Sequence, residues 1–376
     1  MVIVMTDTEY MQRAISLAKR GTGKVNPNPL VGAVIVKNGE IIGEGWHEQY
    51  GGLHAERNAI KNFEERVISG KNAKEDIAGA TMYVTLEPCC HYGKTPPCTE
   101  AIIENGIKRV VIGSADPNPL VAGKGMEILK NSGIEVQSGI LQKECDELNY
   151  VFFHFIKTKT PYVVMKYAMT LDGKIATVTG KSKWITGEKA RARVHEDRNR
   201  YSAIMAGIGT VLSDNPMLTC RMENGQGRNP VRIICDTNLK TPIDSAIVQT
   251  AAQIKTIIAT VSDDILIHIP YMEKGCEILT VSKKDGRIDL SELMIELGKR
   301  NIDSILLEGG STLNFSALES GIVNRIQAYI SPKLFGGEKA KTPVGGEGIL
   351  EVSECFELKN KKVSLIDEDI LIEGEL

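Results

Sequence analysis

The sequence predicts two α/β domains, and three observations support this prediction. The chain has 376 residues, enough for two domains of roughly 100–200 residues each. Apolar runs with strand character alternate with amphipathic stretches of helical spacing, as in sheets that are covered by helices. A polar bridge at residues 157–161 separates two such series, and we expect domains at 1–150 and 151–376.

The first domain is expected to alternate helix and strand. Residues 9–20 place apolar side chains three and four positions apart, which is typical of one buried helical face. Asn38-Gly39 between two apolar runs indicates a β-hairpin. The expected helices are 9–20, 54–66, 99–105 and 124–131, and the expected strands are 30–36, 41–44, 81–86, 109–113 and 134–137.

The second domain repeats the alternation with different lengths. Its expected strands are 162–169, 202–206, 231–235, 256–260, 304–308 and 326–331, and its expected helices are 188–199, 290–299 and 311–320. Residues 362–374 are expected to form a terminal hairpin. No internal repeat is present, which argues against solenoids and propellers.

Composition excludes several classes of protein. The net charge of −3 and the aromatic content of 5% argue against nucleic-acid binding. No apolar run approaches the ~18–20 residues needed to span a bilayer. The first five residues are too short for a signal-peptide core, and eight cysteines in such a chain do not indicate a disulfide framework. We therefore expect a soluble cytoplasmic protein with neither nucleic-acid nor membrane partners.

One His, two Cys and a Glu have the spacing of a hydrolytic zinc site. Such a site needs three protein ligands, an open position for water, and a carboxylate that moves protons without binding the metal. His54 and Glu56 are followed by Pro88-Cys89 and by Cys98. Nucleobase deaminases carry the same elements, although here eight residues rather than two separate the cysteines.

Two other interpretations of these residues stay open. Cys90 or His91 would complete a closed, structural zinc site, or the cysteines would be free thiols in a loop. A closed site leaves Glu56 and Pro88 without a role. Both metal-binding cysteines are also expected at a strand end and a helix start, where such a sheet presents its site.

The deaminase motif resembles a known family. Residues 26–32, 51–56 and 87–98 closely resemble the deaminase half of the bifunctional riboflavin-biosynthesis deaminase/reductases. The resemblance implies a cytidine-deaminase-like α/β/α sandwich in which Zn²⁺ is held by three ligands and Glu56 shuttles the proton. The implied ligands are His54, Cys89 and Cys98, and the implied substrate contacts are Asn28, His47, His91 and Lys94.

The second domain lacks the Rossmann fingerprint. Residues 207–212 come nearest and lack the third glycine. Residues 308–312 follow an apolar run and open an expected helix, whose N-terminal amides favour a pyrophosphate. On this segment alone, an ordinary strand-to-helix turn is the favoured interpretation.

Residues 166–174, 180–186 and 209–216 resemble the reductase half of the same family. The resemblance implies a dihydrofolate-reductase-like α/β domain that binds NADPH without the Rossmann glycines. The implied cofactor contacts are Ala168, Trp184, Thr210, Asp214, Gly310, Ser311, Thr312, Leu313, Asn314, Phe315 and Ser316. The implied substrate contacts are Ser182, Arg198, Leu218, Arg221 and Glu308.

Lys166 is the expected catalytic residue of the second domain. It lies in a strand that is otherwise apolar on that face, and a buried lysine is costly unless it is paired. We expect it to act with Asp214 or Glu308 during reduction.

The resemblance implies an enzyme with two activities. A zinc-dependent deaminase would convert a diaminopyrimidinone ribosyl phosphate, and an NADPH-dependent reductase would then turn its ribosyl group into ribityl. The expected partners are this small molecule and further copies of the chain. The alternatives are a zinc-bearing RNA-binding or RNA-modifying module, and a deaminase with an inactive regulatory domain.

Overall fold

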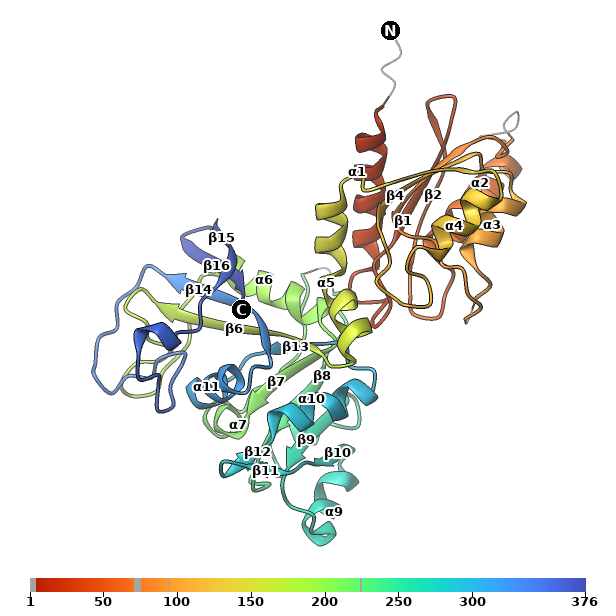
Figure 1. Ribbon diagram of the computed structural model, residues 1–376. Coiled ribbons are helices and arrows are strands. Elements are labelled where there is room, and N and C mark those ends of the chain that lie inside the picture. The colour runs from red at the N-terminus through yellow and green to blue at the C-terminus, as the bar shows by residue number, and fades with distance from the viewer. Residues whose placement is uncertain (1–4, 71–75, 94, 224) are drawn as a thin grey trace. The chain divides into compact units, whose positions relative to one another are not determined.

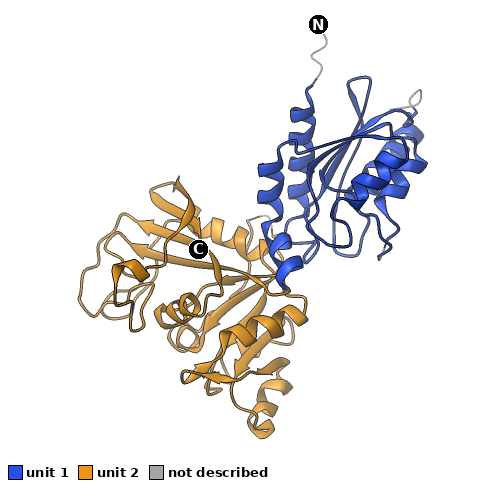
Figure 2. Cartoon of the chain, in the orientation of Figure 1, with its two compact units in different colours: residues 1–158 blue, residues 159–376 orange. Residues whose placement is uncertain are grey.

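The computed structural model describes residues 5–70, 76–93, 95–223 and 225–376, and the chain forms two compact units, residues 1–158 and 159–376 (Figures 1 and 2). The expected division after residue 150 falls inside helix α5 (Gln142–Thr158). The backbone is non-helical at Asn149 (φ −118°, ψ 15°), directly beside the expected boundary, and helix resumes beyond this kink. The compact units divide after Thr158, where α5 ends. Among the described residues, none of the helices combines the length and apolar character that a bilayer crossing requires.

Unit 1 is built on a five-stranded sheet with the order β2-β1-β3-β4-β5. Strand β1 pairs antiparallel with β2 and β3, whereas β3, β4 and β5 are parallel. The predicted hairpin is confirmed, since Asn38 and Gly39 both adopt the positive φ that a tight turn between β1 and β2 requires. The strands are β1 (Gly32–Lys37), β2 (Glu40–Trp46), β3 (Thr81–Leu86), β4 (Arg109–Ser114) and β5 (Glu135–Ser138).

Helices cover both faces of this sheet (Figure 1). Alternate side chains of β1 serve the two faces, with Ala33 and Ile35 packing under one set of helices and Val34 and Val36 under the other. Helices α1 (Asp7–Ala18) and α5 cover one face, and α2 (Ala55–Ile68), α3 (Cys98–Glu104) and α4 (Lys124–Asn131) cover the other. A short 3₁₀ turn, η1 (Lys19–Gly21), follows α1.

Helix α2 packs unusually close to the sheet. A Cβ atom on Gly45 of β2 would lie 2.3 Å from the backbone nitrogen of Ala59, so only glycine fits there. This contact fixes the start of α2, which carries His54 and Glu56, against the sheet.

Unit 2 contains a nine-stranded sheet with the order β10-β9-β8-β7-β13-β6-β14-β16-β15. The first seven strands of this order are parallel, and β16 and β15 add an antiparallel hairpin, as predicted for the tail. The strands are β6 (Tyr162–Thr170), β7 (Ala203–Gly207), β8 (Val231–Cys235), β9 (Thr256–Thr260), β10 (Cys276–Thr280), β13 (Ser304–Leu307), β14 (Val323–Ser331), β15 (Lys359–Ile366) and β16 (Asp369–Glu375). A separate two-stranded hairpin is formed by β11 (Lys283–Lys284) and β12 (Arg287–Ile288).

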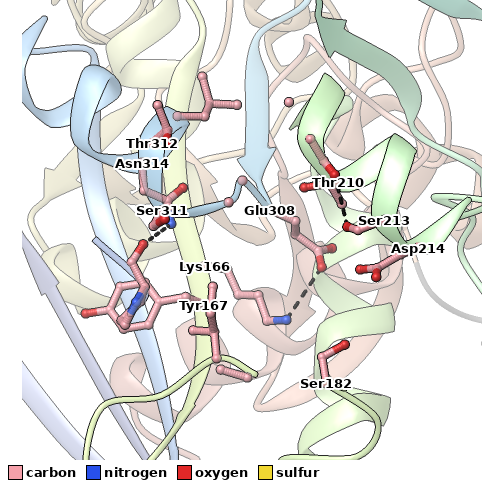
Figure 3. A pocket seen from close by; sticks show the side chains of 18 of the residues that line it. Lys166, Tyr167, Ser182, Thr210, Ser213, Asp214, Glu308, Ser311, Thr312 and Asn314 are labelled. Carbon is pink, nitrogen blue, oxygen red and sulfur yellow. Dashed lines mark hydrogen bonds and ion pairs between the residues drawn. The ribbon is translucent and has the colours of Figure 1, made fainter. Parts of the chain in front are cut away.

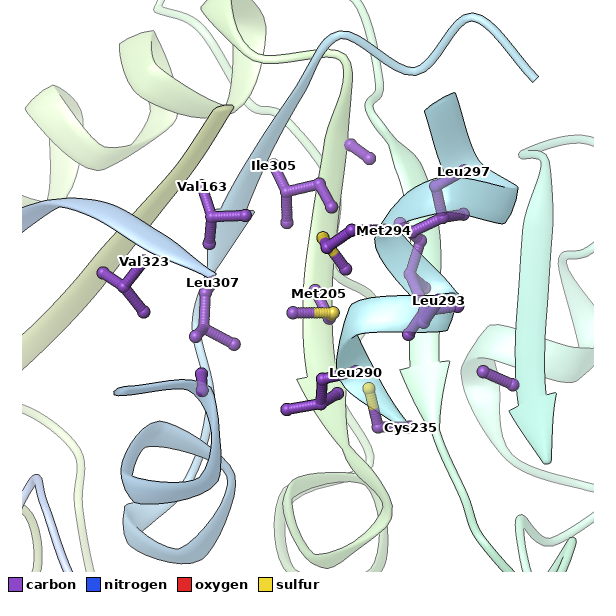
Figure 4. Close-up of a cluster of buried hydrophobic side chains, with 14 of the residues drawn as sticks. Val163, Met205, Cys235, Leu290, Leu293, Met294, Leu297, Ile305, Leu307 and Val323 are labelled. Carbon is purple, nitrogen blue, oxygen red and sulfur yellow. The ribbon is translucent and has the colours of Figure 1, made fainter. Parts of the chain in front are cut away.

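The core of unit 2 lies on both faces of this sheet. On one face, Leu290, Leu293 and Leu297 pack against strand residues such as Met205 and Ile305 (Figure 4). On the other face, a second cluster surrounds Ile204, Ile234 and Ile258. The helices of this unit are α6 (Glu188–Arg200), α7 (Ile208–Asp214), α8 (Ala246–Gln249), α9 (Ile265–Glu273), α10 (Leu290–Lys299) and α11 (Ser311–Glu319), with a 3₁₀ turn η2 (Val352–Glu354).

Candidate active sites

Three residues of unit 1 bring their ligand atoms together as predicted. His54 precedes α2, Cys89 follows β3, and Cys98 is the first residue of α3. His54 Nδ1 lies 3.4 Å from Cys89 Sγ and 3.5 Å from Cys98 Sγ, and all three ligand atoms lie within 4.8 Å of one another. Zn–N and Zn–S bonds of ~2.0–2.3 Å at tetrahedral angles require N···S separations of about 3.5 Å. The group therefore fits a zinc ion.

The thiols of this cluster interact with each other. Hydrogen bonding from Cys98 and from His54 lowers the pKa of Cys89 to about 4. A thiolate is the form that binds a metal. The cluster thus favours the thiolate at Cys89, whereas the hydrogen bond with Cys89 and burial raise the pKa of Cys98.

Glu56 lies in the first turn of α2, two residues beyond His54, and is 3% exposed. Burial raises its pKa, and the charge of Cys89 raises it further. A buried carboxyl group with a raised pKa, beside a metal site and outside the ligand group, is suited to accepting and returning a proton.

The sequence interpretation missed Glu87, which holds the loop around the site. Its carboxylate accepts hydrogen bonds from the backbone nitrogens of Gly123 at 3.1 Å, Met126 at 3.2 Å and Asp116 at 3.3 Å. These bonds anchor the start of α4 against the end of β3. The signal available in the sequence was a carboxylate directly before Pro88-Cys89.

Cys90 and His91 are not part of the cluster of ligand atoms. The thiol of Cys90 contacts the carbonyl of Leu120 at 3.6 Å. The Nδ1 atom of His91 is buried without a hydrogen-bond partner. A closed site with either residue as fourth ligand is therefore not the arrangement found.

His47 and Asn28 lie beside the zinc site. The ring of His47 is 5.4 Å from that of His54, in an edge-on arrangement. Its Nδ1 donates to the carbonyl of Leu53 at 2.9 Å, so Nε2 is free to accept from Asn28 Nδ2 at 3.1 Å. Burial lowers the pKa of His47, which keeps this ring neutral. Lys94, the remaining predicted contact in this unit, lies outside the described residues.

Unit 2 has a cleft of about 1070 Å³ at the carboxyl ends of β6, β13, β7 and β8 (Figure 3). Most of the residues predicted for the reductase site line it: Lys166, Ala168, Ser182, Trp184, Arg198, Thr210, Asp214, Arg221, Glu308, Gly310, Ser311, Thr312, Leu313, Asn314 and Ser316.

Leu218 and Phe315 are not among the residues that line the cleft. Leu218 is 5% exposed and packs in a hydrophobic cluster with Val211 and Leu239. Phe315 is 9% exposed and packs against Gly346, where an added Cβ would lie 2.1 Å from its ring. Phe315 belongs to α11 and Leu218 to the loop that follows α7, and both side chains are buried in the core.

Three charged side chains form a buried network on the floor of the cleft. Glu308 accepts from Arg198 Nε at 2.6 Å and Nη2 at 3.0 Å, and Lys166 Nζ lies 3.5 Å from the same carboxylate. Burial alone would raise the pKa of Glu308, but Arg198 and Lys166 lower it to about 2. Of the two carboxylates expected beside Lys166, Glu308 is therefore the one in contact with it (Figure 3).

Arg198 lines the cleft and is also bonded within the protein. Its side chain is 14% exposed, and its third hydrogen bond goes to the carbonyl of Thr219 at 2.9 Å. Three of the five N–H donors of the guanidinium are thus used within the protein. Glu308 is its principal partner because an ionised carboxylate at this depth needs a fixed cation.

Arg221 lies against a histidine that the sequence interpretation missed. Its backbone nitrogen donates to His195 Nδ1 at 3.2 Å, and its Nη2 lies 3.4 Å from His195 Nε2. Burial and the charges of Arg198 and Arg221 lower the pKa of His195 to about 4. A neutral imidazole therefore separates the two arginines. The sequence signal for His195 was its position about one helical turn before Arg198, which places both side chains on the same face of the helix.

Trp184 forms an exposed aromatic wall of the cleft. It is 61% exposed, and the guanidinium of Arg191 lies 4.6 Å from its ring centroid. Arg191 also donates to the carbonyl of Thr186 at 2.8 Å, and Lys333 donates to the carbonyl of Trp184 at 3.0 Å. Lys183 Nζ also lies 6.0 Å from the ring centroid, and the exposed part of the ring is available to a planar ligand.

The N-terminus of α11 opens into the cleft. Gly310 precedes the helix, and no side chain caps its first amides. A Cβ on Gly309 would lie 2.6 Å from Asn314 Oδ1, so glycine lets the turn close tightly. Uncapped amides beside glycines fit a pyrophosphate, in agreement with one of the two interpretations of residues 308–312.

Comparisons with known proteins match both units. Residues 161–372 match the RibD C-terminal domain, and residues 4–114 match the cytidine and deoxycytidylate deaminase zinc-binding region. The riboflavin biosynthesis protein RibD of Actinobacillus pleuropneumoniae is 59% identical over 98% of this chain and 95% of its own length. RibD of Escherichia coli is 38% identical over 98% of this chain and 99% of its own length.

A solved structure has the same architecture over nearly the whole length. The diaminohydroxyphosphoribosylaminopyrimidine deaminase/5-amino-6-(5-phosphoribosylamino)uracil reductase of Thermotoga maritima superposes with a TM-score of 0.85 at 42% identity, covering 98% of each chain. The match includes both units described here. The chain therefore belongs to the RibD family of bifunctional deaminase/reductases of riboflavin biosynthesis.

Proposed function

We propose that unit 1 hydrolytically deaminates a diaminopyrimidinone ribosyl phosphate and that unit 2 reduces the ribosyl group of the product to ribityl with NADPH. The observation that carries this proposal is the presence of two separate sites in one chain. One is the His54, Cys89 and Cys98 group beside buried Glu56, and the other is the cleft around Lys166. Zinc supplies Lewis-acid activation of water in the first site, and NADPH supplies the hydride in the second.

In the deaminase site, Glu56 would take a proton from the attacking water and return it to the departing amino group. Its burial supports this role because a carboxyl group with a raised pKa exchanges protons readily near neutral pH. Asn28, His47, His91 and Lys94 would contact the substrate. The buried, unpartnered Nδ1 of His91 supports its assignment as a group that awaits a ligand.

In the reductase site, Lys166 would donate the proton that opening and reducing the ribosyl ring consumes. The ring oxygen would gain this proton as the nitrogen lone pair breaks the C–O bond and forms an iminium ion. Hydride from NADPH would add to its carbon, the former anomeric carbon, and give the neutral amine. Glu308 holds the ammonium group in place from below. Ser182 and Arg221 would bind the substrate phosphate, together with the two Arg198 donors that the protein does not use.

The cofactor would lie across the remaining wall of the cleft. Ala168, Trp184, Thr210 and Asp214 would contact it, and the turn from Gly310 to Ser316 would bind its pyrophosphate. Leu218 and Phe315 would act by packing behind these contacts, because their side chains lie in the core. We further propose that the chain works in the cytoplasm as a homo-oligomer, which light scattering on the purified protein would measure.

Paired variants test the division of labour. Glu56→Gln keeps the shape of the side chain but cannot carry the proton. We expect it to retain zinc and to lose deamination by the ~10²–10⁴-fold typical of general acid–base catalysis. Reduction of previously deaminated substrate should stay unchanged. Lys166→Met should show the opposite pattern, and equal loss of both activities in either variant would contradict two independent sites.

A further inference from the structure

Two exposed cations at one end of the reductase cleft have no role in the function proposed above. Arg287 lies on the β11–β12 hairpin, and Lys240 lies in the loop that follows β8. Both line the cleft. A third lysine, Lys341, also lines the cleft, and its backbone carbonyl accepts from the nitrogen of Ile175 at 2.9 Å. Because Ile175 follows β6 closely, Lys341 lies at the β6 end of the cleft, and Arg287 and Lys240 belong to the other end.

Strand order gives a bound dinucleotide its direction. The relevant strands follow one another as β6, β13, β7 and β8. Lys166 lies on β6 and Glu308 follows β13, so the nicotinamide, which must reach the reacting carbon, belongs at that side. This step rests on the proposed function. With the pyrophosphate at the start of α11, the adenosine half of the cofactor extends over β7 toward β8. Because neighbouring strands are about 4.8 Å apart, each strand that it crosses takes it that much further from Lys166.

Arg287 lies at that distant end. The β11–β12 hairpin begins at Lys283, just after β10 ends at Thr280, and β10 is the edge strand beyond β9 and β8. Arg287 Nη1 donates to Ser316 Oγ at 2.8 Å, in the second turn of α11. The guanidinium therefore lines the cleft from its β8–β10 side, which is where the adenosine ribose would lie.

We propose that Arg287, assisted by Lys240, binds the 2′-phosphate of NADPH and sets the preference for NADPH over NADH. The planar fork of an arginine matches a phosphate dianion, and the bond to Ser316 orients it while leaving four donors. Lys240 adds a second positive charge from the facing loop.

Asp236, the carboxylate at the end of β8, is not placed to bind the 2′ position of the adenosine ribose in competition with a phosphate. In Rossmann proteins, an acidic residue after a strand binds the 2′-hydroxyl and thereby selects NADH. Asp236 directly follows β8, but it is 1% exposed. Its Oδ2 accepts from the nitrogen of Thr241 at 2.6 Å and from its hydroxyl at 2.8 Å. Because that oxygen serves the loop, the end of β8 is compatible with a phosphate.

Equilibrium binding tests the proposal on the full chain. Titration calorimetry with 2′,5′-ADP and 5′-ADP isolates the contribution of the 2′-phosphate without turnover. We expect the unaltered chain to bind 2′,5′-ADP at least tenfold more tightly. Arg287→Gln should reduce that ratio at least fivefold and leave the affinity for 5′-ADP unchanged. Arg287→Lys should retain part of the ratio, and Lys240→Gln should cause a smaller loss.

Lys284→Gln is the matched control, since Lys284 is an exposed cation on the same hairpin that does not line the cleft. It should leave the ratio unchanged. An unchanged ratio in Arg287→Gln, or equal weakening of both ligands, would overturn the inference and leave NADPH-dependent reduction intact. An unaltered chain that bound neither NADPH nor 2′,5′-ADP would overturn the proposed reductase function as well.

Discussion

Arg198 and Glu308 form a two-point pair in which Nε and Nη2 of the guanidinium lie 2.6 and 3.0 Å from the two carboxylate oxygens. Both side chains are 14% exposed. The pair stands between α6 and the end of β13, and it holds the carboxylate on which Lys166 rests. Arg198 therefore positions Glu308, and through it Lys166, in addition to any contact that it makes with a phosphate.

Arg198→Ala is expected to impair reduction through Glu308. With Lys166 as its remaining partner in this network, the pKa of Glu308 should rise from its value of about 2. The carboxylate then protonates at higher pH, so the acidic limb of the reductase pH profile should move upward. We expect kcat to fall at least ~10-fold while KM for the pyrimidine rises, because Lys166 loses the fixed carboxylate that positions it. Removing one partner of a buried pair should also lower the free energy of unfolding, by about 3–5 kcal/mol. Deamination should be unaffected.

The conservative variant separates geometry from charge. Arg198→Lys restores a cation without the fork and should recover only part of kcat. If Arg198→Ala changed KM alone and left both kcat and the acidic limb unchanged, the arginine would act on the substrate and not through Glu308.

Cys98→Ala is expected to remove zinc from unit 1. The ligand atoms of His54, Cys89 and Cys98 form one group, and two ligands do not hold Zn²⁺ tightly. Elemental analysis should find about one zinc per unaltered chain and much less in the variant. Cys90→Ala is the matched control, because the thiol of Cys90 contacts Leu120 instead. Loss of zinc in the control but not in Cys98→Ala would reverse the assignment.

Local patterns predicted the architecture of unit 1 closely. Residues 124–131 begin and end as expected, because the apolar spacing is regular and Gly133 adopts a positive φ just beyond the helix. The order of His54, Glu56, Cys89 and Cys98 also predicted which residues meet. Metal chemistry constrains residue type and spacing so strongly that the site is readable from the sequence.

Unit 2 was less readable where local propensity and structure disagree. Helix α9 contains several isoleucines and Pro270, which do not favour helix, and no helix was therefore expected at these residues. The partners of Arg198 were equally invisible, because Glu308 lies 110 residues further along the chain. Whether an arginine meets a carboxylate or solvent depends on tertiary packing, which spacing within one helix does not encode.

Arg191→Ala is expected to weaken cofactor binding by releasing Trp184. The guanidinium lies 4.6 Å from the ring centroid and ties the ring to the start of α6. An exposed cation–π contact contributes about 0.5–1 kcal/mol, so the dissociation constant for NADPH should rise roughly two- to fivefold. Fluorescence titration measures this change. Lys189→Ala, on the same helix but paired with Asp367, should leave it unchanged.

A buried carboxyl group makes the stability of unit 2 depend on pH. Asp197 is 2% exposed, and its Oδ2 has no hydrogen-bond partner. Burial raises its pKa to about 6, against the opposing charges of Arg193 and Arg200 and with a contribution from Glu373. The unfolded chain has the ordinary value of 3.8. The folded state therefore binds this proton more tightly than the unfolded state does.

Asp197→Asn should remove that dependence. For a group whose pKa is raised on folding, the stabilisation is complete below pH ~4 and is lost as pH rises toward ~6. The difference between a pKa of 3.8 and one of about 6 corresponds to roughly 3 kcal/mol of folding stability at most. Calorimetric unfolding at pH 4.5 and pH 7 should show the variant gaining stability relative to the unaltered chain at the higher pH. The neighbouring, exposed Glu196→Gln should not reproduce this gain, and an equal difference at both pH values would mean that Asp197 ionises normally in the folded protein.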